Sequence, residues 1–146
     1  MRKLSRKKPN REHMIKNLAA SLVLYETIET TESKAKEVKS FLEKVIARHK
    51  SGDLNDIRSI NAIFFDKIAA KKMIEELISR YQSRSSGFIR SFRLKNRLGD
   101  NAEMMRLELI DKKVFTNKDK NQDSLDKEDV KIKTTVKGKV KENAGK

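Results

Sequence analysis

Apolar side chains recur at two different spacings along this chain. From residue 11 to residue 81 they return every three or four positions, which is the spacing of amphipathic helices. We predict helices over residues 11–25, 32–49, 54–64 and 67–81. The clearest stripe, in the second of these segments, consists of Ala35, Val38, Leu42, Val45, Ile46 and His49.

Each predicted helix is preceded by a polar residue that can accept hydrogen bonds from its first-turn amides. These candidate caps are Asn10, Thr30 or Thr31, Asp53 and Asp66. In the third helix, the apolar side is expected to consist of Leu54, Ile57, Ile60 and Phe64.

In the second part of the chain the spacing changes to two, which predicts strands. Over residues 88–95 we expect one face with Phe88, Phe92, Leu94 and also Arg90, and the other with Ile89, Ser91, Arg93 and Lys95. Over residues 104–111 we expect Met105, Leu107 and Leu109 on one face. These two strands form a plausible antiparallel pair joined by a basic loop, and the β-branched segment 26–31 predicts a further short strand.

Together these elements predict an α+β fold, a compact single domain of about four helices packed on a small sheet of about three strands. Residues 1–10 lack apolar periodicity and predict an extended basic arm, followed by a core at 11–112. Residues 113–146 predict a Lys-rich disordered tail, because their few apolar side chains cannot offset the entropy of ordering them.

The positive charge of the chain, formally +14, is concentrated in two stretches. Residues 1–25 contain seven Lys and Arg against one acid, and residues 77–99 contain six with no acid. Between them, residues 26–76 contain ten bases and ten acids and are neutral. Two cationic stretches on a neutral body indicate a polyanionic partner, most often nucleic acid.

Two sets of residues are therefore candidate contacts to phosphate and ribose. The first set is entirely basic: Arg2, Lys3, Arg6, Lys7, Lys8, Arg11 and Lys16. The second mixes bases with small hydrogen-bonding residues: Arg84, Ser85, Ser86, Gly87, Arg90, Arg93, Lys95 and Arg97. Guanidinium forks, ammonium groups, hydroxyls and backbone amides are the groups that hold phosphates, although part of the second set is also expected on a solvated strand edge.

Other classes of function receive little support from the sequence. The absence of cysteine excludes disulfides and thiolate metal sites and fits the reducing cytoplasm. No apolar run approaches the ~20 residues of a membrane span, and no catalytic, cofactor or phosphate-loop motif is present. His13 and His49 lie near predicted helix ends, where a capping or core-edge role is more typical than general-base catalysis. We therefore expect no enzymatic activity, cofactor, metal, membrane association or small-molecule substrate.

Several short motifs also occur in an order that resembles a known family. They are Arg2–Arg6, Met14–Leu22, Glu26–Thr31, Lys34–Glu37, Arg80–Arg84, Gly87–Arg90, Gly99–Ala102 and Met105–Asp111. Over residues 2–111 this set resembles the bacterial-type ribosomal protein L17 family of the large subunit. The chain departs from the family pattern at Asn10, Phe88 and Glu103, where the family commonly has His, Tyr and Pro.

The resemblance implies a non-enzymatic structural component of the large ribosomal subunit in the cytoplasm. It also implies that the protein binds large-subunit ribosomal RNA near the nascent-chain exit region, beside neighbouring ribosomal proteins, and has a compact α+β fold. Two alternatives remain open on charge and residues alone. One is a free nucleic-acid-binding or DNA-compacting protein, although no predicted helix has a recognition-helix pattern; the other is an RNA-processing enzyme that would need His13 or His49.

Overall fold

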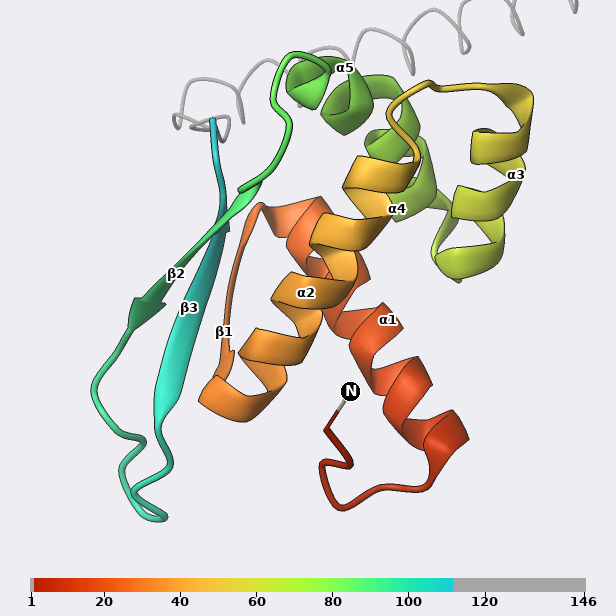
Figure 1. Cartoon of the computed structure of the whole chain (residues 1–146). Coiled ribbons are helices and arrows are strands. Elements are labelled where there is room, and N and C mark those ends of the chain that lie inside the picture. Colours follow the sequence, from red (N-terminus) through yellow and green to blue (C-terminus); the bar gives the residue numbers. More distant parts are fainter. Residues whose placement is uncertain (1, 112–146) are drawn as a thin grey trace, which may run out of the picture. The chain divides into compact units, whose positions relative to one another are not determined.

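A three-stranded antiparallel sheet forms one layer of the protein, and helices cover one of its faces (Figure 1). The computed structural model describes residues 2–111, so the tail predicted at 113–146 lies outside the described residues. In chain order the elements are α1 (Lys8–Tyr25), β1 (Thr27–Thr31), α2 (Glu32–Arg48), α3 (Leu54–Ile63), α4 (Lys67–Lys72), the π-helical turn η1 (Met73–Leu77), α5 (Ile78–Tyr81), β2 (Ile89–Arg93) and β3 (Met104–Leu109). The predicted α+β fold is confirmed.

The last strand in sequence, β3, lies at the centre of the sheet and is antiparallel to both β1 and β2. Met105, Leu107 and Leu109 are buried and alternate with partly exposed residues, as the period of two predicted. Their side chains pack under α1 and α2, both of which contact β3. The main core therefore lies between these two helices and one face of the sheet.

The predicted stripe of the second helix is buried in full in α2, from Ala35 to His49. From α1, the core receives Ile15, Ala19, Leu22 and Val23. The third helix differs from the expectation, because Leu54 is 75% exposed while Ile60 and the following Phe64 are buried. Leu54 begins α3 at its outer end, so only the later apolar residues of this short helix reach the core.

Three of the four predicted N-cap residues do not cap a helix with their side chains. α1 begins at Lys8, ahead of Asn10, because Pro9 fits the first turn of a helix, where an N–H group has no intrahelical partner. Thr31 and Asp53 occupy the capping positions of α2 and α3, but neither side chain accepts a capping hydrogen bond. Asp66 is confirmed as the cap of α4, since its Oδ1 accepts from the Ile68 amide at 2.9 Å.

The helix predicted over 67–81 is present as one continuous helical run made of α4, η1 and α5. Its middle is a π-helical turn, in which the Ile78 amide donates to the Met73 carbonyl. The wider turn keeps Met73, Leu77, Ile78 and Tyr81 all buried. Regular helical spacing does not predict such a turn.

The faces predicted for the 88–95 strand were wrong. Ile89 is buried and lies opposite Leu109 in the sheet, whereas Phe92 is 46% exposed and lies opposite Arg106. Phe88 is also buried, but it precedes β2 and lies outside the strand alternation. Phe88, just before β2, and Ile89, its first residue, are both buried, so the buried face of the strand is shifted by one position from the prediction.

A buried ion cluster joins the end of α1 to the 67–81 helical run. Glu26 is only 2% exposed and ends α1 in the left-handed conformation, with φ of 59°. Its carboxylate accepts two hydrogen bonds from Arg80, at 3.1 and 3.2 Å, and lies 3.0 Å from Lys72 Nζ. Burial lowers the pKa of Arg80, but the hydrogen bonds and charge of Glu26 outweigh this effect and raise it. Arg80 therefore stabilises the interior, although it belongs to the second cationic stretch of the sequence.

Candidate nucleic-acid interface

We predicted an extended arm over residues 1–10, but residues 2–7, called the N-terminal turn below, are folded. Leu4 and Ser5 both have positive φ, 52° and 51°, and the Arg6 amide donates to the Lys3 carbonyl at 3.2 Å. Positive φ at both central residues is the geometry of a type I′ turn. The exposed bases Lys3, Arg6 and Lys7 are therefore presented by a closed turn next to the start of α1.

Two contacts attach the N-terminal turn to the helices. Arg11 Nη1 lies 3.5 Å from the Lys3 carbonyl oxygen and 3.4 Å from that of Arg6. The backbone amide of Arg2 donates to Glu37 Oε1 of α2 at 3.0 Å. Arg11, a predicted RNA contact, is thus half-buried and holds the turn, which leaves its neighbours to face solvent.

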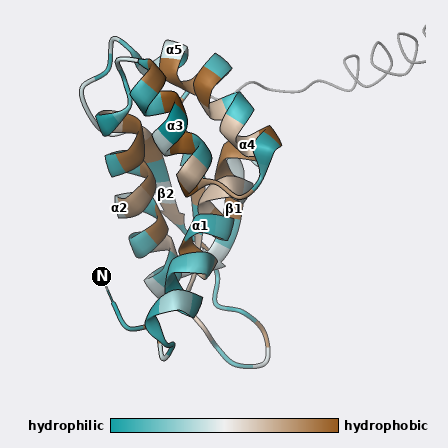
Figure 2. Ribbon diagram, turned by 90° about the vertical axis from the view of Figure 1, so that its right-hand side faces the viewer, coloured by the Kyte–Doolittle hydropathy of each residue, from teal (hydrophilic) through white to brown (hydrophobic). Residues whose placement is uncertain are grey.

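The second predicted set is spread along the molecule: Arg90 and Arg93 lie in β2, and the other members lie in loops at its two ends (Figure 1). The α5–β2 loop, residues 82–88, lies at one end, and the β2–β3 loop, residues 94–103, lies at the other, as does the N-terminal turn. The end that holds the β2–β3 loop, the N-terminal turn and the start of α1 is coloured mainly as hydrophilic in Figure 2. The fold therefore places Lys95 and Arg97 with the N-terminal bases and separates them from Arg84.

The α5–β2 loop exposes Arg84, Ser85, Ser86 and Gly87 together. Its base is fixed by Lys50, whose Nζ donates to the Arg84 carbonyl and lies 5.2 Å from the centre of the Phe88 ring. Gly87 has φ of 69°, a conformation that favours glycine. Sequence reasoning missed Lys50, because nothing local marks a lysine at the end of α2 as the support of a loop 34 residues later.

Tyr81 also anchors the α5–β2 loop. Its ring packs against Phe88 with centroids 5.3 Å apart, and its hydroxyl donates to the Ile110 carbonyl. Burial raises the pKa of this hydroxyl, so it stays protonated and keeps the hydrogen bond at neutral pH. The loop is exposed at its tip and rigidly held at its base.

Several of the basic residues predicted to contact phosphate form ion pairs with acidic side chains of the protein itself. Arg97 Nε donates to Asp100 Oδ1 at 3.0 Å, and this pairing lowers the pKa of Asp100 to about 2. Arg84 lies 3.7 Å from Asp111, a longer and exposed contact. Exposed pairs of this kind contribute little to stability and can exchange for a phosphate. Within residues 2–111, Arg90 and Lys95 are exposed and form no ion pair.

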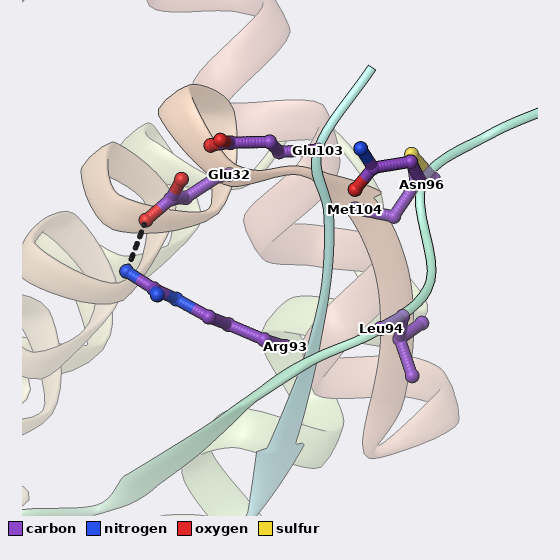
Figure 3. A pocket seen from close by; sticks show the side chains of 6 residues that line it. All are labelled: Glu32, Arg93, Leu94, Asn96, Glu103 and Met104. Carbon is purple, nitrogen blue, oxygen red and sulfur yellow. Dashed lines mark hydrogen bonds and ion pairs between the residues drawn. The ribbon is translucent and has the colours of Figure 1, made fainter. Parts of the chain in front are cut away.

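Arg93 points toward Glu32 at the start of α2, beside a small pocket that Leu94, Asn96, Glu103 and Met104 also line (Figure 3). Its Nη2 lies 3.4 Å from Glu32 Oε1, yet its side chain remains 82% exposed. The carboxyl groups of Glu32 and Glu103 share a hydrogen bond, which lowers the pKa of Glu32 to about 2 and raises that of Glu103. This pair makes the Arg93 side of the β2–β3 loop less positive than the sequence suggests.

The two histidines have different surroundings. His49 is buried at the end of α2 with Nδ1 2.8 Å from the Val45 carbonyl, which confirms a core-edge role. His13 is exposed and neither caps a helix nor lies in the core, because its ring stacks on Phe65. The predicted contact Lys16 is half-buried in the same place, with Nζ 5.1 Å from the Phe65 ring centre.

The part of the chain that the structure describes meets neither the requirements of a metal site nor those of a membrane span. Among residues 2–111, no three His, Cys, Asp or Glu side chains are grouped so as to hold a metal ion. None of the helices in that range has the length and apolar character to cross a membrane.

Comparison with known proteins gives one consistent family. Residues 14–110 match the family described as Ribosomal protein L17. The chain is 42% identical over 109 residues to the Large ribosomal subunit protein bL17 of Helicobacter hepaticus, covering 75% of this chain and 94% of the relative. It is 39% identical over 109 residues to the protein of the same name from Campylobacter concisus, covering 75% and 92%. The chain therefore belongs to the ribosomal protein L17 family and is a structural protein of the large ribosomal subunit, not an enzyme.

Proposed function

We propose that this protein binds large-subunit ribosomal RNA through both of its basic ends, near the nascent-chain exit region and beside neighbouring ribosomal proteins. The observation that carries the proposal is the placement of exposed bases at opposite ends of a neutral helical body. The exit-region location rests on the family resemblance. Each end contacts a different RNA segment, and the rigid body fixes the distance between them.

The N-terminal end supplies mainly charge. Lys3, Lys7 and Lys8 are exposed and make no ion pair among residues 2–111, and Lys95 lies at the same end. Lysine ammonium groups neutralise phosphates as point charges and release condensed counterions. This end therefore contributes most of the salt-dependent part of the binding.

The α5–β2 loop supplies hydrogen bonds as well as charge. Ser85 and Ser86 are exposed residues between Arg84 and Gly87, and a Cβ at Gly87 would meet nothing within 4 Å. Hydroxyl, guanidinium and backbone amide groups contact phosphate oxygens and ribose hydroxyls, which is how structured RNA is recognised through shape with little base readout. Lys50 and Tyr81 hold the loop in place, so little conformational entropy is lost when it binds.

Salt dependence of binding to purified large-subunit ribosomal RNA tests the proposal. With six to ten phosphate contacts, affinity is expected to fall by roughly 10³–10⁵ between 50 and 200 mM salt by duplex-DNA calibration, and somewhat less for RNA. Binding that is insensitive to salt, or equally tight to duplex DNA, would contradict it. Equal affinity for DNA would instead favour a free DNA-binding protein.

A pair of matched double variants locates the interface. Replacing Lys7 and Lys8 with alanine is expected to weaken RNA binding and to reduce the log–log salt slope by roughly 0.7–0.9 for each lost phosphate contact. Replacing Lys44 and Arg48, two exposed bases of α2, removes the same charge and is expected to change binding little. Equal losses in the two variants would show that only net charge matters.

The division into arm, core and tail is part of the same proposal. Truncation after Lys113 is expected to leave folding and incorporation into large subunits intact, because the proposed contacts all lie before that residue. Cosedimentation with large subunits through a high-salt sucrose gradient measures incorporation. Loss of the truncated protein from the particles would assign a role to the tail.

A further inference from the structure

An exposed aromatic stack lies on α1, close to the basic N-terminal end. Phe65 and His13 have ring centroids 4.9 Å apart and an interplanar angle of 14°, and Lys16 Nζ lies 5.1 Å from the Phe65 centroid. Phe65 is nevertheless 57% exposed, although the adjacent Phe64 is only 3% exposed. Phe64 thus anchors the segment between α3 and α4 in the core, whereas Phe65 lies against α1 and is exposed to solvent.

A second exposed apolar side chain follows the stack in the sequence. Ile68, three residues after Phe65 at the start of α4, is 70% exposed. The acid between them, Asp66, is engaged as the N-cap of α4 and accepts from the Ile68 amide. A stacked histidine and phenylalanine, with a lysine ammonium group over the phenylalanine ring, are chemically suited to a nucleobase and its phosphate.

The position of the stack connects it to the basic end of the protein. His13 and Lys16 lie on the same helix as Lys8, and eight residues of helix span about 12 Å. An RNA strand that contacts Lys8 can therefore reach the stack within a few nucleotides. Unpaired bases in RNA are commonly bound by stacking on aromatic and histidine rings beside basic side chains.

From this arrangement we propose that an unpaired nucleotide of large-subunit ribosomal RNA stacks on the His13–Phe65 pair, with Lys16 against its phosphate. This site rests on the proposed RNA-binding function and lies outside the two basic ends. Stacking one base contributes a factor of about 5–150 in affinity and depends on the aromatic ring, not on net charge.

A tryptophan reporter tests the site directly, because the chain contains no tryptophan. In the full-length Phe65→Trp variant, binding of purified large-subunit ribosomal RNA is expected to quench the indole fluorescence and to shield it from acrylamide. The matched control is Leu54→Trp on α3, since Leu54 is 75% exposed and lies away from the stack. Equal quenching at both positions, or none at position 65, would overturn the proposal.

Affinity measurements separate stacking from simple packing. Phe65→Leu retains an apolar side chain but no ring, so it is expected to weaken RNA binding about 5- to 150-fold at an unchanged salt slope. Its circular-dichroism melting curve should match that of the wild type. Wild-type affinity in a folded Phe65→Leu variant would overturn the proposal, as would fluorescence changes that appear only in assembled particles and mark a protein contact.

The two proposals fail in different ways. If the wild-type protein does not bind ribosomal RNA, the proposed function itself is wrong. If the Lys7 and Lys8 double variant loses salt-dependent binding while Phe65→Leu binds normally, the basic ends bind RNA and only the stacking site is wrong.

Discussion

Replacing Glu26 with glutamine removes the negative charge from the buried cluster that joins α1 to Arg80 and Lys72. Glutamine has the same side-chain length as glutamate, and it allows residue 26 to keep its φ of 59°. The substitution therefore tests the charge of the side chain with little change in shape. It leaves two cations, each with a side chain only 13% exposed, beside a neutral amide.

The expected destabilisation follows from what each cation retains. Removing one partner of a buried ion pair typically costs about 3–5 kcal/mol. Arg80 keeps a longer contact to Glu76 at 3.7 Å, and Lys72 keeps a hydrogen bond to the Leu24 carbonyl at 2.8 Å. We therefore expect the lower end of the range, about 3 kcal/mol, out of a total of about 5–15 kcal/mol for a domain of this kind.

Urea unfolding of the full chain at neutral pH, followed by circular dichroism, measures the loss. The matched control is Glu29→Gln, because Glu29 also pairs with an arginine, Arg106, at 2.6 Å, but their side chains are 50% and 41% exposed. An exposed pair contributes about 0–1 kcal/mol, so the control should barely shift the unfolding midpoint.

Two results would refute this reasoning. If Glu26→Gln and Glu29→Gln lower the unfolding free energy equally, burial does not determine the strength of the interaction. If adding Arg80→Met to Glu26→Gln restores no stability, the cost does not come from an unpaired buried cation. A changed urea slope would instead indicate a change in compactness.

Three further predictions concern the surface. Arg11→Lys keeps the charge but loses the guanidinium whose Nη1 contacts the Lys3 and Arg6 carbonyls, so RNA affinity should fall several-fold at an unchanged salt slope. Asp100 should titrate in NMR with a pKa of about 2, and Arg97→Ala should raise it toward the ordinary 3.8. The Arg97–Asp100 pairing is then complete above pH 3.8 and lost as the pH falls through about 2. The raised pKa of Glu103 means that its protonated form is favoured by folding, so this contribution is present below its ordinary 4.5 and lost as the pH rises. Glu103→Gln keeps a hydrogen-bond donor toward Glu32 at every pH, and should raise the urea midpoint at pH 7 but not at pH 3.

Each of these has a clear contrary outcome. Wild-type affinity in Arg11→Lys would show that a point charge suffices at that position. An Asp100 midpoint near 4 in the unmodified protein would mean that Arg97 does not hold it in solution. Equal midpoints for Glu103→Gln and the wild type at pH 7 would mean that the two carboxyl groups do not share a hydrogen bond.

Local periodicity predicted the fold well where burial repeats along one element. The α2 stripe and the alternation of β3 follow directly from one buried face in each element, so sequence spacing was sufficient. It failed at β2, where Phe88 and Ile89 are both buried, and at the π-helical turn, where tertiary packing widens a helix. The prediction of a side-chain cap also failed at α2. There the backbone amide of Glu32, in the first turn, donates to the backbone carbonyl of Glu103 at 3.0 Å.

The candidate interface was predicted less completely, because counting charges does not identify their partners. Arg80 and Glu26 are 54 residues apart in sequence, and Arg93 and Glu32 are 61 apart. Such pairs form only when the fold brings distant elements together. The same holds for the spread of the second basic set along the molecule.

Identity depended on a different kind of signal. No single motif was decisive, but the order of short motifs over residues 2–111 agrees with the family match at 14–110. Family membership confirms the expected place in the large subunit of the cytoplasmic ribosome. The individual RNA contacts stay predictions for the experiments above.

The central position of β3 has a consequence for how the protein is made. Glu29 in β1 and Arg106 in β3 are 77 residues apart, so at a synthesis rate of about 5–20 residues per second roughly 4–15 s separate them. Among residues 2–111, both β1 and β2 pair only with β3, so their backbone groups stay unpaired until β3 is made. A chain whose synthesis stops before Met104 thus contains two strands without a partner, which chaperones and proteases can recognise. The sheet order therefore makes the completion of the sheet depend on the synthesis of β3.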